Sequence, residues 1–141
     1  VVQEELIRER LKLLAEYVGD LQEVAVGIDR TDFREDKILR RFTERTLHLA
    51  IEACLDIGFH IISTEGYREP RTGREVIDIL AENGWIDGGL QARLQGMAGF
   101  RNILVHDYAT IDLDIVLNVL QNNLADLREF GVAIVDRLDA L

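Results

Sequence analysis

The sequence predicts an all-α fold, a bundle of about five helices. Through most of the 141 residues, apolar positions recur at three- and four-residue steps, which is typical of helices packed on one face. No stretch shows the alternation of apolar and polar residues expected of strands, and the single proline lies in a break between periodic segments. A chain of this length fits a single core, so we expect residues 1–141 to form one domain.

One apolar stripe near the N-terminus predicts the first helix. Its members are Ile7, Leu11, Leu14, Val18, Leu21, Ala25 and Ile28. Thr31 or Asp32 is placed to cap the next helix, which we expect to run to about Ile62. The second half of that helix, LHLAIEACLDIGFHII, is apolar on most faces and is therefore predicted to form the centre of the bundle.

The segment STEGYREPRTG interrupts the periodicity with two glycines and the proline. After it, Thr72 followed by Glu75 predicts a capping box for a short helix that reaches about Glu82. The dipeptide Asn83-Gly84 is expected to end this helix. A fourth helix is predicted over roughly Gly88 to Leu104.

Asp112 is expected to cap the last helix, which carries a second heptad-like stripe. The stripe consists of Leu113, Leu117, Leu120, Leu124, Leu127, Ile134 and Leu138. The first and last helices can face each other within one chain or pack against a second copy, and the sequence leaves both arrangements open.

The net charge of −10 argues against a protein that coats nucleic acid, although it allows an enzyme with one local basic groove. The single cysteine, Cys54, has no internal disulfide partner and is expected to be a buried thiol. No uninterrupted apolar run is long enough to span a bilayer, and VVQEELIRER lacks the pattern of a signal segment. We therefore expect a cytoplasmic protein without a membrane partner.

The stretch FRNILVHDY gathers polar side chains among core-type residues. Five residues turn a straight helix by roughly 500°, so Arg101 and His106 would point about 140° apart if the helix continued. They converge if the helix ends near Val105 and the chain turns back through the residues up to Tyr108. We expect this turn, because HDYATID holds few strong helix formers.

Such a pair suits phosphoryl chemistry without a metal ion. His106 can take a proton from a ribose 2′-hydroxyl or give one to a leaving oxygen, and Arg101 can stabilise the charge that grows on the phosphate. Asn102 can donate its amide to phosphate or orient the histidine. No metal-ligand spacing is present, since His48 and His60 are isolated and are expected to be core or helix-end residues. On the residues alone, a structural arginine at a helix C-terminus explains Arg101 equally well.

The longer pattern Gly99-Phe100-Arg101-Asn102-x-Leu104-Val105-His106-x-Tyr108 resembles the HEPN superfamily, and within it the HepT branch of toxins. TERTLHLAIEACLDIGFHII is similar to the second helix of that family, and LQGMAGFRNILVHDY to its motif helix. The resemblance extends from about Asp36 to Asn118. It departs at Ala109 and Thr110, where relatives often have a large aromatic residue.

The resemblance implies a metal-independent endoribonuclease, the toxin of a toxin–antitoxin pair. Such toxins act as symmetric dimers, or as higher even oligomers, with the arginine and histidine of both chains facing one groove. Arg101, His106 and Asn102 would be the catalytic residues. The implied partner is a minimal nucleotidyltransferase antitoxin similar to MntA, which would transfer AMP from ATP to Tyr108. The added bulk and negative charge would keep RNA from the groove. No resident cofactor is implied.

A basic stripe offers one place for RNA to bind. Its members, expected on one face of the second helix, are Arg34, Lys37, Arg41 and Arg45. Nearby carboxylates can instead make this stripe an ordinary solvated face. Two alternatives to the enzyme also remain open: a HEPN module that binds a nucleotide or a partner without cleaving anything, and a purely structural helical dimer.

Overall fold

The chain folds as an all-α bundle, as its periodicity predicts. The computed structural model describes residues 2–106 and 111–141. Within these two ranges there are seven helices rather than about five. In chain order they are α1 (Val2–Ala25), α2 (Arg30–Glu35), α3 (Lys37–Glu65), α4 (Gly73–Glu82), α5 (Gly88–His106), α6 (Leu113–Asn122) and α7 (Leu124–Ala140).

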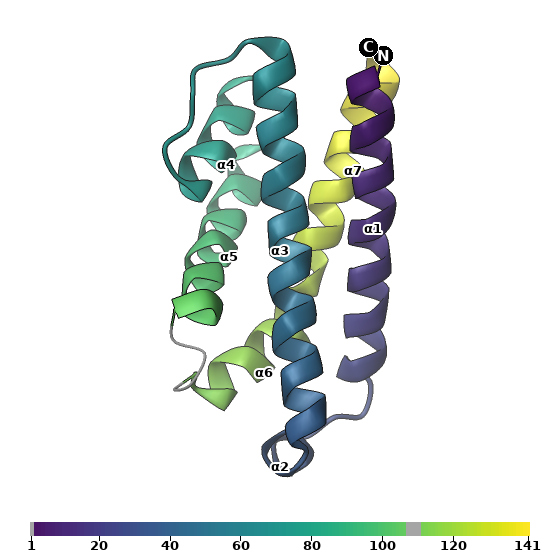
Figure 1. Cartoon of the computed structure of the whole chain (residues 1–141), viewed down its shortest axis with the longest axis vertical. Helices are drawn as coiled ribbons and strands as arrows, with labels where there is room; N and C mark the ends of the chain where they lie inside the picture. Colours follow the sequence, from purple (N-terminus) through teal and green to yellow (C-terminus); the bar gives the residue numbers. More distant parts are fainter. Residues whose placement is uncertain (1, 107–110) are drawn as a thin grey trace.

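The long helix α3 lies at the centre of the bundle (Figure 1). Helices α1 and α7 lie side by side along one side of it, and α4 and α5 pack against the other. Helices α2 and α6 pack together at the end of the bundle opposite the two termini. The first and last helices therefore pair within one chain, which decides between the two arrangements that the sequence leaves open.

The expected second helix is two helices, because two aspartates cap separate segments. Asp29 accepts a hydrogen bond from the backbone N–H of Asp32 at 2.8 Å, and Asp36 accepts one from the N–H three residues further on at 3.0 Å. The prediction that Thr31 or Asp32 caps one long helix is therefore wrong. The short α2 places the side chain of Phe33, which is fully buried, in the core.

Two predicted caps are confirmed. Thr72 accepts from the N–H of the residue three positions later at 3.1 Å, and Asp112 accepts from the N–H two positions later at 2.8 Å. The helix that begins after Asp112 is broken at Asn123, whose side chain donates to the buried Asp126 at 3.3 Å. Arg93 of α5 forms an ion pair with the same carboxylate at 3.4 Å, so this break is tied to the motif helix.

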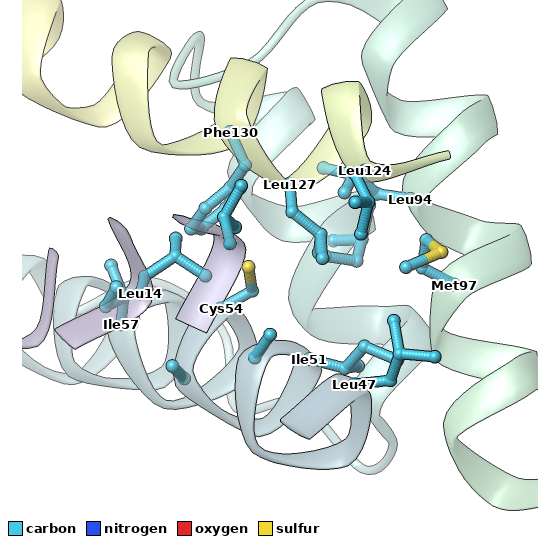
Figure 2. Packing of buried hydrophobic residues seen from close by; sticks show 14 of the residues in the cluster. Leu14, Leu47, Ile51, Cys54, Ile57, Leu94, Met97, Leu124, Leu127 and Phe130 are labelled. Carbon is cyan, nitrogen blue, oxygen red and sulfur yellow. The ribbon is translucent and has the colours of Figure 1, made fainter. Parts of the chain in front are cut away.

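Helix α3 supplies the middle of the hydrophobic core (Figure 2). Its inward side chains, among them Ile51 and Ile57, meet Leu127 and Phe130 of α7. Cys54 lies among them as the expected buried thiol, and burial raises the pKa of that thiol. By length and composition alone α3 could cross a membrane, but 56% of its most apolar window is buried in the bundle, which is the pattern of a core helix.

Candidate functional site

The structure places Arg101 and His106 on the same helix, with the histidine as the last residue of α5. The helix ends one residue beyond Val105, close to the expected position, so His106 lies on the helix rather than in the loop after it, and the expected turn lies outside the described residues. Five residues along this helix put the two positions about 140° apart around its axis, and no hydrogen bond joins the two side chains in the described part of the chain. One chain does not bring the two groups together. Tyr108 lies outside the described residues.

Arg101 is held by a carboxylate that the motif does not contain. Its Nε donates to Oε1 of Glu52, which projects from α3, and the two groups form an ion pair. Its Nη1 donates to Oδ1 of Asn102 at 3.2 Å. Because an arginine can only donate, the amide of Asn102 must turn its oxygen toward Arg101 and its NH2 group away. The side chain of Arg101 is one-third exposed, so a ligand can still reach it.

Glu52 is also the centre of a longer chain of polar contacts along α3. His48 Nε2 lies 3.6 Å from the carboxylate oxygen that binds Arg101, and Arg45 Nη1 lies 3.1 Å from His48 Nδ1. Since Arg45 is the donor, Nδ1 accepts and the proton of the imidazole lies on Nε2, facing Glu52. The sequence interpretation of His48 as a core or helix-end residue missed this arrangement. Its one signal was the four-residue spacing between His48 and Glu52 on a helix.

The predicted basic stripe is not one face of one helix. Arg34 lies on α2, and the cap at Asp36 separates it from Lys37, Arg41 and Arg45 on α3. None of the four stripe residues forms an ion pair in the described part of the chain. Only Arg45 is linked to the motif arginine, through the polar chain described above.

No group of three or more His, Cys, Asp or Glu side chains among the described residues is placed to hold a metal ion. The polar groups of the site are the guanidinium of Arg101 itself, the carboxylate of Glu52, the imidazole of His48 and the amide of Asn102. Such a set can bind a phosphate and move a proton.

Comparison with known proteins agrees with the motif. The Ribonuclease HepT-like family matches residues 14–134. An mRNA nuclease HepT of Shewanella oneidensis is 37% identical over 102 residues, 72% of this chain and 77% of the relative. A tRNA nuclease HepT of Aphanizomenon flos-aquae is 30% identical over 107 residues, 76% of this chain and 72% of the relative.

A solved structure of similar fold is the tri-AMPylated Shewanella oneidensis HEPN toxin in complex with its MNT antitoxin. It superposes with a TM-score of 0.83 at 33% identity and covers 92% of this chain and 96% of the toxin. The resemblance that rests on the Arg-x-x-x-x-His-x-Tyr stretch is thus confirmed over nearly the whole bundle, and so is the expected class of enzyme, a ribonuclease. This chain belongs to the Ribonuclease HepT-like family.

Proposed function

We propose that this chain is the toxin of a toxin–antitoxin pair and cleaves RNA without a metal ion through Arg101 and His106. The observation that carries the proposal is the family match, which spans the whole motif. Relatives named as mRNA and tRNA nucleases support RNA as the substrate. Residues 1–141 act as one HepT-like domain in the cytoplasm, with no membrane partner.

The proposed reaction is transfer of the phosphate to the neighbouring 2′-oxygen. His106 accepts the proton of the ribose 2′-hydroxyl while that oxygen forms a bond to phosphorus. The bond from phosphorus to the 5′-oxygen breaks, and a protonated histidine of a second copy gives the leaving oxygen its proton. Arg101 binds the phosphate oxygens as negative charge grows on them, and Asn102 donates its outward amide to the same group. The products are a 2′,3′-cyclic phosphate and a free 5′-hydroxyl.

A second copy supplies what one chain lacks. Arg101 and His106 point apart on one helix, so a symmetric dimer, or a higher even oligomer, is needed to place an arginine and a histidine on one phosphate. The twofold arrangement also provides the two histidines that the proton transfers require. An exposed apolar pair on α3, Ile38 and Phe42, offers surface for such contacts.

We further propose that a minimal nucleotidyltransferase antitoxin silences the toxin. The Tyr108 oxygen attacks the α-phosphate of ATP, a bond from that oxygen to AMP forms, and pyrophosphate leaves. The AMP group adds negative charge beside the motif and repels RNA. Support comes from the Shewanella toxin, which is AMPylated and bound to its MNT antitoxin.

The first experiment is RNA cleavage in EDTA by protein purified without a partner. We expect cleavage that leaves a 2′,3′-cyclic phosphate, and a loss of about 10²- to 10⁴-fold in His106→Ala, because a general acid–base group is removed. Equal cleavage by both proteins would mean contamination or a different site. If neither cleaves and intact mass shows unmodified protein, the alternative of a HEPN binding module is favoured.

AMP transfer is tested by co-expression with the nucleotidyltransferase partner. We expect the intact mass to rise by one or more AMP groups, because Tyr108 offers the acceptor hydroxyl. The control is Tyr108→Phe, which removes only that hydroxyl. An unchanged mass of the wild type, or an increase that survives in Tyr108→Phe, would contradict the assignment.

A further inference from the structure

A cleft of about 300 Å³ opens beside Arg101, and Glu52 of the polar chain described above also lines it. Its walls come from α3, the loop before α4 and the motif helix α5. Besides Arg101 it is lined by Arg71 of the loop and by Phe59 of α3. We propose that this cleft binds one nucleotide of single-stranded RNA next to the scissile phosphate, with Phe59 stacking on the base and Arg71 holding a phosphate. The inference rests on the proposed function and adds a substrate-binding site to it.

The charges in the cleft favour an anion. Its two carboxylates already have arginine partners, since Glu52 pairs with Arg101 and Asp56 pairs with Arg10 at 2.7 Å. The side chain of Arg71 forms no ion pair with any described residue, so its charge is in surplus. A surplus arginine beside Arg101 lets this cleft attract a phosphate even though the chain has a net charge of −10.

The loop that carries Arg71 is anchored. The backbone N–H of Arg71 donates to Oε2 of Glu75 at 3.2 Å. Arg68 in the same loop forms ion pairs with Glu75 and Glu82 at 3.2 and 2.7 Å. A cation on an anchored loop loses less conformational freedom on binding than one on a free loop. The side chain of Arg71 is therefore well placed to hold a ligand rather than only to attract it.

Phe59 provides an aromatic surface at a distance from the phosphate site at Arg101 that a nucleotide chain can span. It is 50% exposed although it is apolar, and it lies on the same face of α3 as Glu52, seven residues further along. Seven residues correspond to about 10 Å along a helix, a span that one or two extended nucleotides cover. A nucleotide chain whose phosphate lies at Arg101 can thus place a base on the ring of Phe59. Stacking on an aromatic ring requires an unpaired base, so the ligand is single-stranded.

Binding of a short fluorescent single-stranded RNA tests the proposal. All variants carry His106→Ala so that the RNA stays intact, and binding is measured in EDTA over a range of salt. We expect Phe59→Leu to weaken binding by about tenfold, because a base loses its stacking partner. We expect Arg71→Ala to weaken binding and to lower the slope of log K against log salt by about 0.7, the loss of one phosphate contact.

Two matched controls change similar residues outside the cleft. Val132→Ala alters an apolar residue of α7 that is 54% exposed, and Arg128→Ala removes an exposed arginine of the same helix. We expect both to bind RNA like the parent, within about twofold. Circular dichroism confirms that each variant is folded.

The outcomes separate the two proposals. If wild type cleaves RNA but the cleft variants bind like the parent, or the controls lose as much as they do, the cleft is not a nucleotide site and the proposed function stands. The cleft is likewise not a nucleotide site if Phe59→Leu and Arg71→Ala weaken only the association with a protein partner. If wild type does not cleave, the proposed function fails, and selective loss of binding in the cleft variants would still establish the RNA site.

Discussion

Arg101 carries its charge beside a carboxylate, because Glu52 accepts from its Nε. An RNA phosphate must therefore compete with Glu52, or be bound by the part of the guanidinium that Glu52 does not contact. His48 lies 3.6 Å from the same carboxylate oxygen, so it is a third group that influences how strongly Glu52 holds Arg101. The affinity for RNA depends on these neighbours as well as on the arginine itself.

Neutralising Glu52 tests this balance. Glu52→Gln keeps the shape of the side chain and removes its charge, so Arg101 should attract phosphate more strongly. We expect RNA to bind about two- to fivefold more tightly in a background of His106→Ala, the size of effect typical of a partly exposed ion pair. The measurement is the dissociation constant for an intact RNA strand.

The control is Glu9→Gln, which makes the same change in net charge at an exposed position of α1. Equal tightening in both variants would attribute the effect to total charge. Weaker binding in Glu52→Gln would instead show that the ion pair holds Arg101 in the orientation that RNA needs.

At the scale of helices, the site depends on how closely α4 approaches α3. A Cβ atom added at Gly58 would lie 2.6 Å from Cγ1 of Val76 and 3.0 Å from Cδ1 of Leu80. Both neighbours are buried and the side chain of Val76 is stiff, so neither can move without repacking. The absent side chain at Gly58 allows the two helices to touch, and this contact positions the loop that carries Arg71.

Alanine at Gly58 is therefore expected to destabilise the fold by about 1–3 kcal/mol through overpacking. The matched control is Gly19→Ala in α1, where an added Cβ meets nothing within 4 Å. There the higher helix propensity of alanine should stabilise the protein by about 0.5–1 kcal/mol. Urea unfolding measures both values. A stabilised Gly58→Ala would show that α4 can move away from α3 at little cost.

For the whole molecule, the decisive question is whether two chains share one groove. A single α5 places Arg101 and His106 apart around its axis, so we expect the proposed dimer to combine an arginine of one chain with a histidine of the other. The same argument explains how an acidic protein can bind RNA, because the cations of two chains would gather in one place while the charge of −10 per chain is spread over the remaining surface.

Mixed dimers test the shared groove. We expect wild type refolded with an equal amount of His106→Ala to keep only about a quarter of the cleavage of the same total amount of wild type, because only dimers of two intact chains hold both histidines. The control is wild type refolded alone at the same total concentration. A remaining activity of about half, which independent chains would leave, or sedimentation of the wild type as a monomer at micromolar concentration, would contradict a shared groove.

Several features of this protein follow from the sequence by itself. The three- and four-residue periodicity determines an all-α bundle, because it places one apolar face on each helix. Thr72 and Asp112 cap helices where expected, since a cap is a local hydrogen bond. The Arg101–His106 pattern indicates the family, because it includes the residues around the pair as well.

The tertiary structure decided the rest. The choice of the capping residue changes the free energy of a helix by only about 1 kcal/mol. The burial of Phe33 can therefore determine that helices begin after Asp29 and Asp36. The pairing of Arg101 with Glu52, and the meeting of Phe59 and Arg71 in one cleft, join residues far apart in the chain. Spacing along a sequence does not reveal such contacts, because they depend on how whole helices pack against one another.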